Sequence, residues 1–481
     1  MHRTKLIEAL RALHTRERTR WRQYVHAGFF NKHEDLRRLA DYVLSFAPAF
    51  DPERLDKRAV WRHLFGPGQP YQELKLNNLI SDLYELLLGY LAYTGCETNL
   101  PEQQLLAANA LLDRNLNAQA GHALERARTL LDRQPAQTAR RQFLEIRWWE
   151  SAEILDSRRS RRIAGEHLLR QAEANDLAFV LEKLRLGAAM LNRHGLAVLQ
   201  ADERPRWLPA IRQWCAEEPL LNEHPAVRVY LAALDLLENP GPDHFSALNA
   251  LLDQHHAVFG PEELAALYQY SLNYCIRRIN DGHPEAYRDA LNLYQTLLDR
   301  NVLLRQGRLS QWTYKNITTA GLRSGAFAWT EQFLYRYREA LPPAERDNAF
   351  AYNLAALHFE KNDFPATLLT LQNVEFTDFT YHLGAKIMQL KCYYLLDETE
   401  ALAALLEAAR QLLRRNRSLS SFGKTANLNF LRALKLLSAW RQAKDRTTQQ
   451  KWRQQRSALA EKVRRMQPLA NKDWLMEMTE A

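Results

Sequence analysis

Pairs of apolar segments recur in the second half of the chain at a spacing of about 37 residues. The clearest pair is YNLAALHFEKNDFPATLLTLQNV, from Tyr352 to Val374, in which two apolar stripes flank the polar turn Asn362-Asp363-Phe364. A comparable pair begins at Asn316, and a third runs from Leu390 to Leu406. One helical hairpin cannot bury its own apolar face, so this recurrence predicts hairpins that cover one another in a stacked array.

The composition favours helices over sheets. With 481 residues, of which 46% are hydrophobic and 25% charged, the chain is too long for one compact core and too apolar to be disordered. Glycine and proline are scarce, and no stretch alternates apolar and polar residues over a useful length. We therefore predict an all-α fold: a right-handed α-solenoid of degenerate helix pairs, preceded by an N-terminal helical module.

Breaks rich in proline, glycine and asparagine indicate how the chain is divided. The strongest break, Asn239-Pro240-Gly241-Pro242, predicts a kink or a boundary. Near the N-terminus, Asp51-Pro52-Glu53 has the sequence of a helix start and Gly66-Pro67-Gly68 that of a helix end. The predicted parts are an N-terminal helical module (1–95), helical hairpin repeats (96–240), the recurring helix pairs (241–417) and a basic C-terminal helical cap (418–481).

The recurring pairs resemble tetratricopeptide repeats. The small residue of that repeat's second helix falls near Thr330 and Thr367, and its bulky partner near Leu334 and Leu371, whereas the Trp-Leu-Gly of the first helix is missing. The ending, from YYLLDETEALAALLEAARQLLRRNRSLS to PLANKDWLMEM, and the front part of the chain look similar to large uncharacterised bacterial proteins of this type. The resemblance implies a helical-repeat fold that binds a partner, and it supplies no catalytic residue.

Motifs for catalysis, cofactors and metals are missing from the sequence. The stretch SLSSFGKT, from Ser418 to Thr425, ends like a phosphate-binding loop, but it lacks the first glycine and a preceding strand. The histidines show no HExxH spacing, and the four cysteines have no paired spacing that would indicate a disulfide framework or a zinc site. We therefore expect a protein that is not an enzyme and that uses no cofactor.

Positive charge is concentrated near the C-terminus. The whole chain has a net charge of +9, but residues 410–465 hold sixteen Lys and Arg against Asp445 and Glu461. Such a segment could attract phosphate backbones or an acidic protein surface, or it could be the solvated outer face of a terminal cap. Helical spacing places its aromatic residues Phe430 and Trp452 on stripes that face a core. The candidate residues for binding an anionic partner are Arg414, Arg415, Arg417, Lys424, Arg432, Lys435, Arg441 and Lys444.

The leading functional prediction is a non-catalytic scaffold that binds a protein partner through a helical-repeat surface. The alternative is nucleic-acid or ribonucleoprotein binding through the basic C-terminal helices, and a third possibility is a regulatory subunit of an enzyme. The N-terminus is charged from its start, and the longest apolar run, Leu86 to Tyr93, is shorter than the roughly 20 residues that cross a bilayer. We therefore expect a cytoplasmic protein without a membrane partner.

Overall fold

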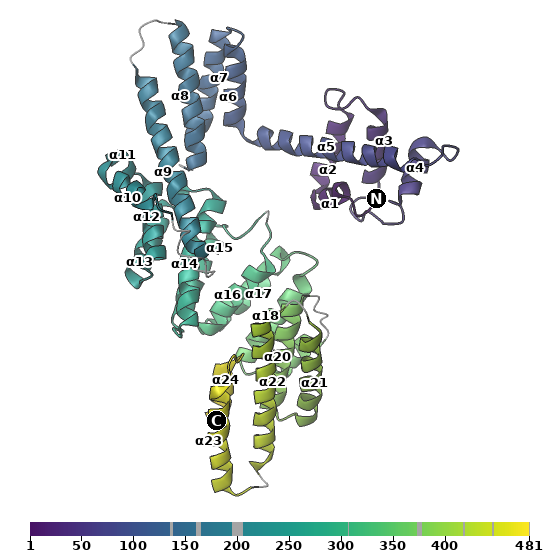
Figure 1. The fold of residues 1–481 in the computed structure, drawn as a ribbon, viewed down its shortest axis with the longest axis vertical. Helices are drawn as coiled ribbons and strands as arrows, with labels where there is room; N and C mark the ends of the chain where they lie inside the picture. Colours follow the sequence, from purple (N-terminus) through teal and green to yellow (C-terminus); the bar gives the residue numbers. More distant parts are fainter. Residues whose placement is uncertain are drawn as a thin grey trace. The chain divides into compact units, whose positions relative to one another are not determined.

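The computed structural model is helical throughout the part of the chain that it describes (Figure 1). That part comprises residues 1–134, 138–159, 165–194, 205–305, 307–372, 378–416, 419–444 and 447–480. In these ranges the only β-type pairing is an isolated bridge between Arg305 and Arg308. The all-α prediction is therefore confirmed. None of the described helices combines the length and the apolar character needed to cross a membrane.

The chain forms two compact units. One comprises Met1–Arg185 and Trp207–Val227, and the other comprises Leu186–Arg206 and Arg228–Ala481. The predicted division into four parts stays a prediction. The helices up to α11 are α1 (Lys5–Ala12), α2 (Thr15–His26), α3 (Glu34–Leu44), α4 (Lys57–Phe65), α5 (Glu73–Thr98), α6 (Leu100–Leu112), α7 (Asn117–Asp132), α8 (Ala139–Arg159), α9 (Glu166–His194), α10 (Leu208–Glu217) and α11 (Pro219–Asn222).

The later helices pack against their neighbours in chain order, as the run from α14 to α22 shows. Within this run α16 also contacts α18, and α18 contacts α20, so these three helices share a surface. The bounds are α12 (Pro225–Glu238), α13 (Pro242–His255), α14 (Pro261–Asn280), α15 (Ala286–Asp299), α16 (Gln311–Arg323), α17 (Phe327–Tyr337), α18 (Arg346–Glu360), α19 (Phe364–Gln372), α20 (Phe379–Leu395), α21 (Thr399–Arg415), α22 (Ser421–Gln442), α23 (Gln449–Arg465) and α24 (Lys472–Glu480).

The first five helices enclose a core of their own, which includes Trp21 and Trp61. One local prediction is wrong here: Asp51-Pro52-Glu53 does not start a helix, because Pro52 and Glu53 belong to a turn. Helix α4 begins at Lys57 instead, because the carboxylate of Asp56 accepts hydrogen bonds from the backbone N–H groups of the first turn. The predicted end of that helix at Gly66 is confirmed.

The turns inside the recurring helix pairs share one geometry. Two residues after each first helix ends, the backbone has a positive φ, at Gly325 (76°), Asn362 (61°) and Asp397 (64°) in the three successive pairs. After α16 the N–H of Ala326 donates to the carbonyl of Gly321 at 2.9 Å, and the corresponding bond recurs in the other two turns. This is the Schellman closure, which satisfies carbonyls at the helix end and favours glycine or asparagine at the left-handed position. The predicted turn at 362–364 is confirmed.

The second helix of each pair lies close to the first. At Gly321 on α16, an added Cβ atom would lie 2.1 Å from Oγ1 of Thr330 on α17. Thr330 and Thr367 are fully buried, and the bulky residues one turn later, Leu334 and Leu371, are buried too. The resemblance to the repeat pattern pointed to these four residues. They are buried where the two helices of a pair pack together.

An ion-pair network joins α7 to α8. The carboxylate of Glu145, which is 8% exposed, accepts hydrogen bonds from Arg128 on α7 at 2.8 Å and from Arg141 on its own helix at 3.1 Å. Arg128 also bonds to Asp132, and its guanidinium lies 5.4 Å from the centre of the Trp148 ring. Burial alone would raise the pKa of the Glu145 carboxyl, but the two arginines together lower that pKa below its usual value.

Candidate functional site

The predicted basic residues lie on or near α21 and α22. Arg414 and Arg415 are exposed in the last turn of α21, and Arg432 and Lys435 are exposed on α22. Lys444 is exposed beyond the end of α22. Arg417 lies outside the described residues. These positions agree with an exposed cationic surface, and their contact with an anionic partner stays a prediction.

Two of the candidate residues bind the C-terminal ends of other helices. The ammonium of Lys424 donates to the carbonyl of Arg414 at 3.1 Å, at the end of α21. The guanidinium of Arg441 donates to the carbonyl of Tyr394 at 2.7 Å, at the end of α20, and lies 3.6 Å from Asp397. Helix ends carry free carbonyls and partial negative charge, so both cations have a structural role.

The aromatic residues of the same segment also have partners within the protein. Phe430 is fully buried, in agreement with its helical spacing. The rings of Trp440 and Trp452 stack on each other at 4.4 Å, with the ammonium of Lys444 at 5.7 Å from the Trp452 ring centre. Each tryptophan covers one face of the other, so this stacked pair packs α22 against α23.

The structural role of Arg441 can be measured against a matched control. Replacing Arg441 by alanine should lower the free energy of unfolding by about 1 kcal/mol, because the α20 carbonyl loses its charged donor. Arg432→Ala, on the exposed side of the same helix, should change it by less than about 0.5 kcal/mol. Urea unfolding of both variants decides the point, and equal effects would exclude the capping role.

The residues that resemble a phosphate-binding loop form an ordinary helix start. The hydroxyl of Ser420 accepts a hydrogen bond from the N–H of Gly423 at 3.1 Å and caps α22. Gly423, Lys424 and Thr425 thus lie near the start of that helix, and the Lys424 ammonium binds the end of α21. Ser418 lies outside the described residues.

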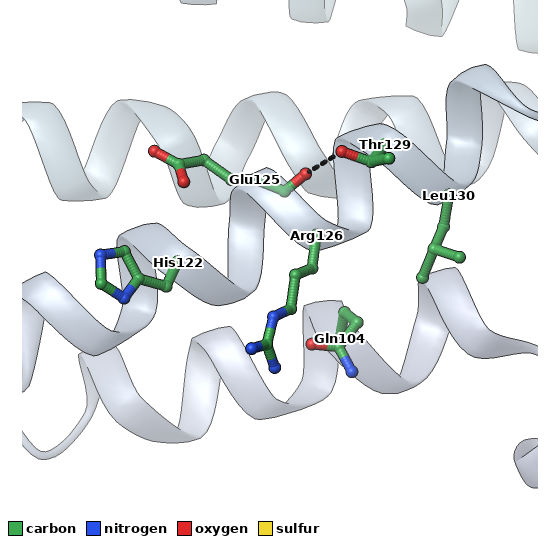
Figure 2. A pocket seen from close by; sticks show the side chains of 6 residues that line it. All are labelled: Gln104, His122, Glu125, Arg126, Thr129 and Leu130. Atoms are coloured by element: carbon green, nitrogen blue, oxygen red, sulfur yellow. Dashed lines mark hydrogen bonds between the residues drawn. The ribbon is translucent and has the colours of Figure 1, made fainter.

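Two shallow pockets are lined mostly by polar side chains. The pocket between α6 and α7 has a volume of about 520 Å³ and is shown in Figure 2. Arg126 extends toward Gln104 there, whereas the Glu125 carboxylate points away from both. A second pocket, of about 580 Å³, is formed around Leu74 and Lys75 at the start of α5. Among the described residues, no cluster of three or more His, Cys, Asp or Glu side chains could hold a metal ion.

A more distinctive arrangement lies on the surface that α16, α18 and α20 share. The ammonium of Lys315 on α16 has three aromatic rings around it: Trp312 on the same helix at 5.9 Å, Tyr352 on α18 at 5.2 Å and Tyr381 on α20 at 5.3 Å, measured to the ring centres. Within the described residues it makes no hydrogen bond and no ion pair within 4 Å. Burial lowers the pKa of Lys315, since the charged form loses water there.

Packing of the rings fixes this arrangement. Tyr352 meets Tyr381 edge to face at 4.9 Å, and Trp312 lies 5.4 Å from Tyr381. The hydroxyl of Tyr381 donates to the backbone carbonyl of Gln311 at 3.0 Å, which ties α20 to the start of α16. Gly384 leaves room for Tyr352, because an added Cβ atom would lie 2.7 Å from the tyrosine hydroxyl.

A second partly buried lysine, Lys391, lies on α20, toward the C-terminal end of the helix from Tyr381. The ammonium of Lys391 is 5.9 Å from the ring centre of Phe359 on α18 and 5.1 Å from that of Trp474 on α24. It donates a hydrogen bond to the side-chain oxygen of Asn471 at 2.8 Å. Burial and the positive charge of Arg323 lower the pKa of Lys391 to about 8. We define the aromatic-lysine face by these residues: Trp312, Lys315, Tyr352, Phe359, Tyr381 and Lys391.

Reasoning from the sequence did not find this face. Trp312 and Lys315 are one helical turn apart, which was the available signal, but they precede Asn316, where the predicted repeat begins. Their partners lie on two other helices. The chain matches no family model, no curated protein and no solved structure. The resemblance to tetratricopeptide repeats therefore stays a prediction, and the geometry of the described residues is the basis for a functional proposal.

Proposed function

We propose that this protein is a non-catalytic scaffold that binds a segment of a protein partner on the aromatic-lysine face. The observation that carries the proposal is Lys315, a partly buried cation that three rings surround and that no described acceptor satisfies. Trp312 beside it is 42% exposed, although it is a large aromatic residue. Tryptophan and tyrosine in partly desolvated positions contribute much of the affinity at protein interfaces.

The order of the helices supports an extended binding surface. Because α16 contacts α18 and α18 contacts α20, side chains from three successive helix pairs form one continuous face. Helical-repeat proteins use surfaces of this kind to hold long segments of their partners. We also propose that these helix pairs stack as a right-handed solenoid. We further propose that the protein acts in the cytoplasm.

Selection of peptides tests the binding role. A library of random 12-residue peptides displayed on phage is selected on the full-length protein, and the selected clones are tested against two variants. We expect clones whose binding is lost on Trp312→Ala, because that ring is exposed within the face. The same clones should bind Tyr335→Ala normally, since Tyr335 is a large exposed aromatic residue on α17, outside the face. If no selected clone depends on Trp312, the proposal is wrong.

A gel mobility experiment addresses the alternative of nucleic-acid binding. Such binding would rest on phosphate contacts, so it would weaken steeply as salt rises and would show little sequence preference. Lys424 and Arg441 would contribute little, because both already bind helix-terminal carbonyls. Retardation of RNA or DNA that is lost on charge reversal at Arg414 and Arg415 would favour this alternative over the scaffold.

A further inference from the structure

Lys315 is a partly buried cation that has no anionic partner among the described residues. Burying an ammonium is unfavourable unless an acceptor or an anion replaces the lost water. Cation–π attraction to the three rings replaces part of the stabilisation that water gave the ammonium. However, a ring offers no hydrogen-bond acceptor comparable with a carboxylate. The ammonium therefore has unused capacity to bind an anion that approaches along the face.

The charged groups around Lys315 do not supply that anion. Asp378 is the acidic residue that favours its charged form, but the Asp378 carboxylate accepts the N–H groups of Thr380 and Tyr381 and so caps α20. Further along the face, Glu360 lies 3.9 Å from Arg323, and the ammonium of Lys391 is bound to the neutral Asn471. The two lysines of the face thus remain without a carboxylate within ion-pair distance among the described residues.

We propose that the partner segment is acidic and that one of its carboxylate side chains binds the ammonium of Lys315. This inference rests on the proposed function and specifies the chemistry of the partner. Charge complementarity supports it, since the face presents two cations that are in contact with aromatic rings and have no carboxylate within ion-pair distance among the described residues. The carboxylate would replace the water that Lys315 has lost, while the partner's apolar atoms would cover Trp312.

The geometry favours an acidic peptide over a nucleic acid. Stacking of bases needs exposed ring faces, but Tyr381 is 1% exposed and Tyr352 packs edge to face against it. Nucleic-acid strands also need a track of exposed cations along their phosphates. Lys315 and Lys391 are instead partly buried points of positive charge. A single carboxylate at a defined position fits such a point better than a phosphate chain does.

A double-mutant cycle tests this pairing directly. The probes are synthetic copies of the Trp312-dependent peptides, each made with its Asp and Glu residues intact and with them changed one at a time to Asn or Gln. Affinity for the wild-type protein should fall at least about 30-fold for one such change, which corresponds to the loss of one buried charge pair. The Lys315→Met variant should bind the intact peptide about as weakly as the wild-type protein binds the neutralised one. Neutralising the same acidic residue should then cause no further loss of affinity for this variant.

Controls separate the possible failures. Lys435→Met removes an exposed cation of α22 and should leave the intact peptide's affinity and its response to neutralisation unchanged. Circular dichroism of Lys315→Met checks that the helices persist, and Lys315→Arg should retain part of the affinity. If peptides depend on Trp312 but neutralising every acidic residue leaves their affinity within about threefold, the inference falls while the scaffold stands. If the acidic residue couples to Lys435 and not to Lys315, the inference is also wrong.

Discussion

Replacing Glu145 by alanine is expected to destabilise the packing of α7 against α8 by about 3 kcal/mol. The carboxylate is buried between two arginines, so its loss leaves Arg128 and Arg141 facing each other without the anion. We take the lower end of the usual range because Arg128 keeps Asp132 and Arg141 keeps the carbonyl of Gln134. Hydrogen exchange of amides in α7 and α8 measures the effect locally, which suits a chain with two compact units.

A control on the same helix shows whether burial is the cause. Glu150 is exposed on α8, and Glu150→Ala should change amide protection by less than about 0.5 kcal/mol. The pKa of Glu145 is lowered from its usual 4.5, so its contribution is present above about pH 4.5 and is lost as pH falls through the lower folded value. Glu145→Gln should remove that acid sensitivity. Equal loss of protection in the two alanine variants would contradict the network's role.

Replacing Gly321 by alanine is expected to destabilise the second unit by about 2 kcal/mol, although alanine normally favours helices. The added methyl group would overlap Oγ1 of Thr330, whose hydroxyl is held by the carbonyl of Ala326 at 2.8 Å. Helices α16 and α17 must then separate or Thr330 must leave its preferred position. Urea unfolding followed by circular dichroism gives the change in stability.

The companion variant Thr330→Ala identifies the source of that effect. In its background the overlapping oxygen is gone and the nearest remaining Thr330 atom is the Cβ at 3.3 Å, so Gly321→Ala should lose most of its cost. The two substitutions should therefore be strongly non-additive. An additive double variant would mean that the contact between Gly321 and Thr330 does not set the spacing of the pair.

Helices and turns were accessible from the sequence because their causes are local. The apolar period of 352–374 and the Asn362-Asp363 turn lie within one hairpin, and the structure confirms both in the residues that it describes. Thr367 and Leu371 were found for the same reason. The start of α4 was misplaced because Asp51-Pro52 and Asp56 carry similar capping signals, and the local sequence does not show which aspartate the helix uses.

The candidate sites were harder to predict from the sequence, because they depend on contacts between residues that are distant in the chain. Charge summed along 410–465 does not reveal that Lys424 and Arg441 reach the ends of α21 and α20. The surroundings of Lys315 depend on Tyr352 and Tyr381, which lie on two other helices and are distant in the sequence. A single sequence without an alignment gives no signal that joins these three residues.

The shared turn at Gly325, Asn362 and Asp397 has a consequence for how the chain acquires its structure. Each closure spans only six residues, so it forms without help from distant parts of the chain. Contacts of such short sequence separation make the search for the native state fast. During synthesis, a hairpin can close soon after it leaves the ribosome and then present its uncovered side to the hairpin that follows. Assembly can thus proceed pair by pair, in the direction of translation.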